Sequence, residues 1–148
     1  MTEKSIVGLT LRVAGHEDLP FARELTRVNM RPYYAQYGLI WQQRAFDQEW
    51  LSRQTFIIHK SAKPVGFFGF TVESDYLYLR DVQLVEPYRG EGIGTWVMQR
   101  IAEIARSHGY NRARLKVFKS NPAKELYLRH GYSVVREDVA LFWMECVV

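Results

Sequence analysis

A glycine-rich stretch, Arg89-Gly90-Glu91-Gly92-Ile93-Gly94-Thr95, has the residue types and spacing that most clearly indicate chemistry in this chain. Its glycines let the backbone turn tightly and approach a ligand closely. The stretch follows strand-like residues and opens a helical pattern, and the N–H groups of a first helical turn attract anions. The sequence therefore predicts an anion site, with a pyrophosphate as the natural guest. The alternative is a tight strand-to-helix turn without a ligand.

Two common phosphate-binding patterns do not fit this stretch. A P-loop requires Gly-Lys-Ser/Thr, which does not follow. The dinucleotide fingerprint reads G-x-G-x-x-G after the first strand of its domain, whereas the spacing here is G-x-G-x-G after several predicted strands. ATP-type and NAD-type loops are therefore disfavoured.

A second stretch reads Asn-Pro-Ala-Lys-Glu-Leu-Tyr-Leu-Arg-His-Gly-Tyr and covers residues 121–132. It is similar to the N-x-A-x-x-L-Y-x-x-x-G-F/Y segment of the GNAT superfamily of N-acetyltransferases. Residues 84–94 resemble the acetyl-CoA motif of the same family, Arg/Gln-x-x-Gly-x-Gly/Ala after a strand and a Pro-x-Tyr-like turn. The resemblance covers roughly residues 65–135, and the first 60 residues share only the family's layout.

The resemblance implies an enzyme that binds acetyl-CoA and a primary amine together, with the neutral amine attacking the thioester directly. The acceptor would be a small molecule or a protein amine, no metal would be needed, and a homodimer is possible. Backbone N–H groups of the glycine loop would hold the pyrophosphate, and the end of the preceding strand would pair with the pantetheine arm. The residues so assigned to the cofactor are Leu84, Val85, Arg89, Gly90, Glu91, Gly92, Ile93, Gly94, Thr95, Asn121 and Lys124.

Two of these residues, and the turn that precedes the loop, match the family pattern less simply. Asn121 could equally be a helix cap. Glu91 stands where family members often carry Lys or Arg, and an acidic side chain beside phosphates is unfavourable unless it points to solvent. The proline of the turn, Pro87, also sits one place later than in many relatives.

Tyr127 is the residue to which the resemblance gives the role of general acid for the departing thiolate. The alternative is an aromatic side chain packed beneath its helix. A phenol has a pKa of about 10 and a thiol has a pKa of about 8.5, so the phenol donates its proton to a thiolate only with help from its position.

The general base is less defined. The resemblance favours Tyr78, and strict alternation along the strand would place it on the same face as Val82 and Leu84. Asp81 is a stronger base but is expected to face the other way, and Glu73 is a third candidate. A water chain to bulk solvent is the alternative to all three.

Aromatic residues concentrate between residues 33 and 50, close to Asp47 and Glu49. Such a group could hold a cationic amine by cation–π and charge contacts. The alternative is an ordinary core between helices and sheet. The residues are Tyr33, Tyr34, Tyr37, Trp41, Phe46 and Trp50.

Other chemistries find little support. The four histidines show no metal-ligand spacing, and no G-x-S-x-G nucleophile elbow is present. Cys146 is the only cysteine, so no intramolecular disulfide is possible, and we expect it to be a packed side chain rather than a nucleophile.

Periodicity and turn residues predict the elements that position these groups. The expected order is β-α-α-β-β-β-α-β-α-β-β, a mixed α/β (α+β) fold with a mostly antiparallel sheet of about seven strands and about four helices. Arg31-Pro32 should end the first helix, and glycines 109 and 131 should close two others. Strands are expected at 9–13, 55–60, 65–72, 76–85, 113–118, 132–136 and 139–145, and helices at 18–31, 42–53, 93–108 and 122–130.

Length and composition fit one domain over residues 1–148. The net charge of +4 suits a polyanionic partner, but the basic residues are spread along the chain, which disfavours a nucleic-acid-binding domain. No signal peptide or apolar run of membrane-spanning length is evident, so a cytoplasmic location is the default expectation. The alternative to an enzyme is a GNAT-like module that holds acyl-CoA as a sensor or docking element without turnover.

Overall fold

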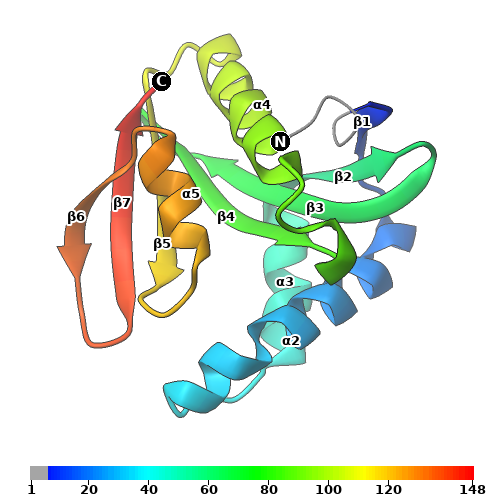
Figure 1. The fold of residues 1–148 in the computed structure, drawn as a ribbon, viewed down its shortest axis with the longest axis horizontal. Coiled ribbons are helices and arrows are strands. Elements are labelled where there is room, and N and C mark those ends of the chain that lie inside the picture. Colours follow the sequence, from blue (N-terminus) through cyan, green and yellow to red (C-terminus); the bar gives the residue numbers. More distant parts are fainter. Residues whose placement is uncertain (1–6) are drawn as a thin grey trace.

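A seven-stranded sheet forms the centre of the computed structural model, which describes residues 7–148 (Figure 1). Its strands follow the order β1-β2-β3-β4-β5-β7-β6, and every neighbouring pair is antiparallel except β4 and β5. The predicted mixed sheet is confirmed. The strands are β1 (Leu9–Val13), β2 (Gln54–Lys60), β3 (Lys63–Val72), β4 (Leu77–Leu84), β5 (Arg112–Phe118), β6 (Ser133–Glu137) and β7 (Leu141–Val147).

Four α-helices cover the two faces of this sheet in the described part of the chain. Helices α2 (Leu19–Gln36) and α3 (Gln43–Ser52) lie on one face, and α4 (Ile93–Ser107) and α5 (Ala123–Arg129) lie on the other (Figure 1). Two short 3-10 turns, η1 (His16–Asp18) and η2 (Glu86–Tyr88), precede α2 and the glycine loop. The predicted element order is therefore confirmed.

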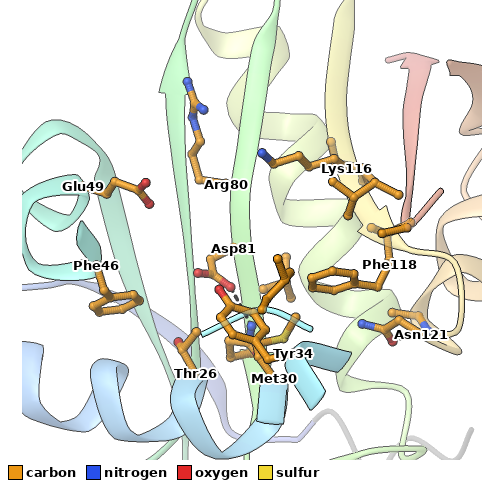
Figure 2. A pocket seen from close by; sticks show the side chains of 18 of the residues that line it. Thr26, Met30, Tyr34, Phe46, Glu49, Arg80, Asp81, Lys116, Phe118 and Asn121 are labelled. Atoms are coloured by element: carbon orange, nitrogen blue, oxygen red, sulfur yellow. Dashed lines mark hydrogen bonds between the residues drawn. The ribbon is translucent and has the colours of Figure 1, made fainter. Parts of the chain in front are cut away.

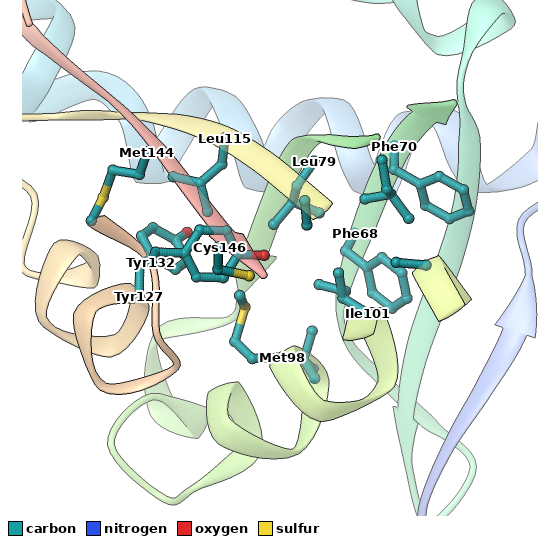
Figure 3. Packing of buried hydrophobic residues seen from close by; sticks show 14 of the residues in the cluster. Phe68, Phe70, Leu79, Met98, Ile101, Leu115, Tyr127, Tyr132, Met144 and Cys146 are labelled. Carbon is teal, nitrogen blue, oxygen red and sulfur yellow. The ribbon is translucent and has the colours of Figure 1, made fainter. Parts of the chain in front are cut away.

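Two apolar clusters hold the helices against the sheet. The larger joins α4 and α5 to strands on both sides of the β4–β5 junction, and Figure 3 shows Phe68, Leu79 and Ile101 meeting in it. The smaller joins α2 and α3 to β2 and β3 through residues such as Trp50 and Phe67. Each fully buried large side chain contributes about 1.5–3 kcal/mol of transfer free energy, so the sheet is a stable platform for side chains at its centre.

The parallel pair β4–β5 separates soon after it begins. Only Leu77 and Tyr78 of β4 pair with β5, opposite Ala113 and Arg114. Beyond these residues the two strands diverge, and Figure 1 shows β4 bending away from β5. The separation leaves the edge of β4 that faces away from β3 without a neighbouring strand in the described structure.

A β-bulge in β4 changes which side chains share a face. Gly69 of β3 lies opposite Asp81, whereas the next residue of β3 lies opposite Leu79, so Arg80 is an extra residue. Leu79 on one side of the bulge and Val82 on the other therefore both pack in the α4 cluster. The prediction that Tyr78 shares a face with Val82 and Leu84 is wrong, because it assumed uninterrupted alternation. Asp81 and Tyr78 both face the α2–α3 side.

Helix α2 continues beyond the predicted stop at Pro32 and ends at Gln36. A proline within a helix removes one backbone hydrogen bond, which usually ends or kinks the helix. Here the last turn gains aromatic packing, since Tyr33 and Tyr37 both stack on Phe118 of β5 with centroids 5.7 Å and 5.5 Å apart. The extension carries α2 across the gap between β4 and β5.

The remaining boundaries of helices and strands agree with the predicted ones within a few residues. Gly109 and Gly131 adopt φ values of 81° and 88° just after α4 and α5, as C-terminal cap residues do. The last strand begins at Leu141 rather than at Val139, because Asp138 accepts hydrogen bonds from the N–H groups of Ala140 and Leu141 and so forms a turn.

Candidate active site

The glycine loop presents the open N-terminus of α4. Gly92 is the N-cap residue with φ 85°, and Gly90 has φ 74°, both in the left-handed region that favours glycine. The first main-chain bond of the helix runs from Trp96 N–H to Gly92 C=O at 3.1 Å. The N–H groups of the residues between them therefore have no partner within the helix. No side chain caps this end, so an anion can accept these bonds.

A neighbouring cation reduces the repulsion between Glu91 and an anion bound at the loop. Its carboxylate lies 3.7 Å from Lys60 Nζ of β2, so a cation offsets the negative charge. Arg89 turns its guanidinium toward α2, where it donates to Asn29 Oδ1. The anion-binding capacity of the loop therefore rests mainly on the main-chain donors at the start of α4.

The strand end before the loop has fewer free groups than predicted. Val85 N–H donates to Val65 C=O at 2.8 Å, and its C=O accepts from Tyr88 N–H at 2.9 Å. The N–H of Val85 is therefore not available to a pantetheine arm, and only the second lone pair of its C=O remains for the predicted role. Leu84 alternates with Val85 and directs its backbone away from β3, toward the gap. Its C=O accepts from Asn29 Nδ2 at 3.0 Å, which leaves the N–H as the group available there.

A cavity of about 590 Å³ fills the gap between β4 and β5, and Figure 2 shows its side chains. Residues 79–83 of β4 and 115–118 of β5 form two of its walls, and α2, α3 and the start of α5 close the rest. Seven residues singled out from the sequence line it: Tyr34, Trp41, Phe46, Glu49, Asp81, Asn121 and Tyr127. Its lining does not include the candidates Tyr78, Glu73 and Lys124, nor the residues Tyr33, Tyr37, Asp47 and Trp50 of the aromatic region.

Tyr127 reaches the cavity from the α5 side and is only 8% exposed. Burial raises the pKa of its phenol above the ordinary value of 10.0, and the nearby charge of Asp81 raises it further. A phenol with a raised pKa keeps its proton at neutral pH and acts as a hydrogen-bond donor. The neighbouring Tyr132 ring lies 6.0 Å away, outside the cavity lining.

Asp81 enters the cavity from β4 and pairs with a buried arginine that the sequence did not indicate. Arg53 Nη1 lies 3.3 Å from Asp81 Oδ2, and the side chain of Arg53 is 2% exposed. Burial raises the pKa of Asp81, whereas the charge of Arg53 and a hydrogen bond from Gln83 Nε2 at 2.6 Å act in the opposite direction. The result is a carboxyl group held in one place inside the cavity (Figure 2).

Gly69 makes room for this ion pair. A Cβ atom on Gly69 would lie 2.7 Å from Cδ of Arg53 and 3.2 Å from Oγ1 of Thr55. Gly69 is also the register partner of Asp81 across β3 and β4. Because no side chain stands on β3 at this point, Arg53 crosses the strand and reaches Asp81. The sequence carries this signal only as an isolated glycine within a strand.

Tyr78 lies in a different environment. The guanidinium of Arg80 stacks on its ring at 4.1 Å, and the ring of Tyr76 lies 6.3 Å away. Burial raises the pKa of its phenol. These contacts lie near the paired start of β4 and β5 rather than in the cavity.

The segment before α5 supports both interpretations of Asn121. Its Oδ1 accepts from Ala123 N–H at 2.9 Å, which caps the start of α5, and the residue also lines the cavity. Lys124 instead points toward β7, with Nζ 4.6 Å from the centre of the Phe142 ring.

Replacing Arg53 with methionine should lower the unfolding free energy by about 3–5 kcal/mol at neutral pH, because Asp81 then keeps a buried charge without a cation. This loss of unfolding free energy should shrink as the pH falls toward about 4, the ordinary pKa of a carboxyl group, because protonation of Asp81 removes its charge. Urea denaturation at several pH values measures both effects. Arg80→Met is the matched control: Arg80 pairs with Glu73 but is 41% exposed, so its loss should cost about 0–1 kcal/mol. Equal losses in the two variants would contradict this account of the pair.

Other features add no chemistry to the site. The part of the chain that the structure describes contains no group of three His, Cys, Asp or Glu side chains arranged to hold a metal. Cys146 is buried, and burial raises the pKa of its thiol. None of the described helices is both long and apolar enough to cross a membrane.

Comparison with solved structures shows the same fold. The N-acetyltransferase PaiA from Thermoplasma acidophilum, in complex with coenzyme A, superposes with a TM-score of 0.76 at 19% identity, over 95% of this chain and 99% of that one. A GNAT family acetyltransferase from Elizabethkingia anophelis with acetyl-CoA bound gives 0.77 at 10% identity, over 96% and 99%.

Sequence comparison adds a shorter match. Mouse (Mus musculus) thialysine N-epsilon-acetyltransferase is 40% identical over 45 residues, which are 30% of this chain and 26% of that protein. The match therefore spans about a quarter of its length. The model of the acetyltransferase (GNAT) family matches residues 22–132, which include the glycine loop, the cavity strands and Tyr127. The match begins well before the region in which the sequence motifs are recognisable, and it covers most of the chain: the protein belongs to the acetyltransferase (GNAT) family.

Proposed function

We propose that the protein transfers an acetyl group from acetyl-CoA to a primary amine. One observation carries the proposal: β4 joins an open helix N-terminus to a cavity that holds two buried titratable side chains, Asp81 and Tyr127. The strand lines the cavity with residues 79–83 and then leads into the glycine loop. An extended ligand with an anionic end at the loop therefore reaches the cavity along the unpaired edge of β4.

The residues present fit acetyl-CoA at this edge. The first turn of α4 offers main-chain donors to a pyrophosphate, and Leu84 N–H faces the gap where a pantetheine arm would run. Related structures with the same fold are described with coenzyme A and with acetyl-CoA. When bound, acetyl-CoA supplies a thioester whose carbonyl carbon accepts an attacking amine.

Asp81 and Tyr127 are suited to opposite halves of this reaction. As the amine nitrogen bonds to the acetyl carbon and the carbon–sulfur bond breaks, the nitrogen must lose a proton and the sulfur must gain one. Asp81 is the buried carboxyl group at the centre of the cavity and is the one we assign to take the amine proton. Tyr127 stays protonated at neutral pH and can donate a hydrogen bond to the departing sulfur, although its raised pKa opposes complete transfer of the proton. This assignment favours Asp81 over Tyr78 because Asp81 lines the cavity.

The acceptor enters from the α2–α3 side. Tyr34 and Phe46 give that wall an aromatic surface, and Glu49 adds a carboxylate beside it (Figure 2). Trp41 also lines the cavity. Such a wall suits the alkyl and ammonium parts of an amine. The thialysine acetyltransferases match over too short a segment to transfer their acceptor to this chain.

A panel of primary amines tests the proposal. Acetyl-CoA is offered with spermidine, lysine and a short peptide with a free N-terminus, and the products are followed by mass spectrometry and by thiol release. We expect an acetylated amine and coenzyme A in equal amounts. Binding of acetyl-CoA without transfer to any amine would instead favour a non-catalytic acyl-CoA-binding module.

Replacing Asp81 with asparagine should lower kcat by about 10²–10⁴-fold, because it removes the carboxylate that we assign as the base. Asp81→Glu should retain more activity than Asp81→Asn, since it keeps a carboxylate. Tyr78→Phe should remain close to wild type in kcat. Initial rates, with circular dichroism to verify folding, measure all three variants. A slow Tyr78→Phe beside an active Asp81→Asn would reverse the assignment of the base.

A further inference from the structure

A chain of hydrogen bonds runs from the glycine loop to the cavity. Arg89 Nη2 donates to Asn29 Oδ1 of α2. Asn29 Nδ2 donates to Gln83 Oε1 at 3.1 Å, and Gln83 Nε2 donates to Asp81 Oδ1 at 2.6 Å. The other carboxylate oxygen of Asp81 is held by Arg53 at 3.3 Å. Three separate elements, the loop, α2 and β4, are thereby connected.

The two ends of this chain fix its direction. A guanidinium can only donate hydrogen bonds, and an ionised carboxylate can only accept them. Asn29 must therefore present its oxygen to Arg89 and its nitrogen to Gln83, and Gln83 must do the same toward Asp81. Neither amide can rotate by a half-turn without breaking two bonds.

The middle of the chain is shielded from water. Gln83 is 7% exposed, and Asn29 is partly buried against β4, where its Nδ2 also donates to Leu84 C=O at 3.0 Å. A hydrogen bond broken in such a place is not replaced by water, so its loss is expensive. Arg89 is exposed, so its side chain can respond to an anion at the loop.

We propose that Asn29 and Gln83 are positioning residues that couple the position of the Arg89 guanidinium to the position of the Asp81 carboxylate. Through this coupling, a bound cofactor and a bound acceptor amine stabilise each other. The inference rests on the proposed function. Arg89 begins the loop that would hold the pyrophosphate, and Asp81 faces the acceptor. Because binding free energies are reciprocal, a relay that helps one ligand also helps the other.

The first experiment uses coenzyme A as the probe and requires no turnover. Side-chain amide signals of Asn29 and Gln83, and backbone signals of Gly90 and Gly92, are followed by NMR in the ¹⁵N-labelled protein. Saturating coenzyme A should shift both sets in the wild type. In Asn29→Asp, which keeps an acceptor for Arg89 but lacks the donor to Gln83, the glycine signals should still shift and the Gln83 shift should disappear.

The outcomes separate this inference from the proposed function. A Gln83 shift that persists in Asn29→Asp would mean direct contact with the ligand and would overturn the relay. No shift at Gly90 and Gly92 in the wild type would remove the proposed function and the relay together. Asn111→Asp, the same substitution just before β5 and outside the cavity lining, should behave as the wild type does.

Kinetics give a second readout with the most active amine of the panel. For Asn29→Asp, kcat/KM for the amine should fall about tenfold, while the affinity for acetyl-CoA measured without amine stays close to wild type. In Asn29→Ala, which removes the donor to Gln83 without adding a charge, the acidic limb of the pH profile should move to higher pH, because the hydrogen bond from Gln83 favours the ionised form of Asp81. Four other side chains interact electrostatically with Asp81 and are unchanged in this variant: Arg53, Glu49, Tyr34 and Tyr127. A uniform loss of activity with an unmoved limb would indicate a structural role alone.

Discussion

Replacing Gly92 with glutamate is expected to abolish the binding of acetyl-CoA. Gly92 is the N-cap residue of α4 and has φ 85°, so any side chain there carries backbone strain of about 1–2 kcal/mol. Glutamate also places a negative charge where the N–H groups and the helix dipole would hold a pyrophosphate. Thermal unfolding with and without acetyl-CoA measures the effect. Ligand at about 100 times its dissociation constant stabilises the wild type by about 2.7 kcal/mol, and the variant should show none of this.

Gly109→Glu is the matched control for Gly92→Glu. Gly109 follows the other end of α4 with φ 81°, so the same substitution introduces a similar strain far from the loop. We expect Gly109→Glu to lower the melting temperature to a similar extent and to keep the full stabilisation by acetyl-CoA. Stabilisation that survives in Gly92→Glu would show that the ligand does not bind at this helix end.

Replacing Tyr127 with phenylalanine should lower kcat by about 10²–10⁴-fold, the usual contribution of a positioned general acid. The change removes one oxygen from a side chain that lines the cavity and whose raised pKa keeps it protonated. The affinity for acetyl-CoA should hardly change, because the ring stays in place. Single-turnover rates and separate binding measurements distinguish these two effects.

Tyr132→Phe controls for the loss of a buried hydroxyl. Tyr132 lies 6.0 Å from Tyr127 and is similarly buried, but it does not line the cavity. Its variant should be somewhat less stable and should turn over at a rate close to wild type. Equal losses of kcat in both variants would remove the special role of Tyr127.

Local patterns were sufficient to predict the order of the elements and the glycine loop. Glycines at helix ends and apolar periodicity act over a few residues, and these signals are legible in a sequence. The stop predicted at Pro32 failed because aromatic stacking on Phe118 carries the helix onward, and that contact joins residues about 80 positions apart. Packing of this kind overrides local preference and leaves no local signal.

The differences between the predicted and the observed site have separate origins. The bulge at Arg80 shifts the alternation of β4, and no local pattern in residues 76–85 indicates it. The face predicted for Asp81 relative to Tyr78 was therefore wrong, whereas the Arg53–Asp81 pair was not predicted because it depends on Gly69 of another strand. Val85 was assigned to the cofactor without knowledge that Val65 and Tyr88 already engage its backbone.

Calorimetric titration of the wild-type protein with acetyl-CoA tests whether the glycine loop holds this cofactor, and it requires no knowledge of the acceptor. We expect one saturable site per chain. It also predicts that coenzyme A competes for this site, since both carry the pyrophosphate that the first turn of α4 would hold. Absence of binding at millimolar acetyl-CoA in a folded sample would contradict the account, because the glycine loop would then be a turn without a ligand.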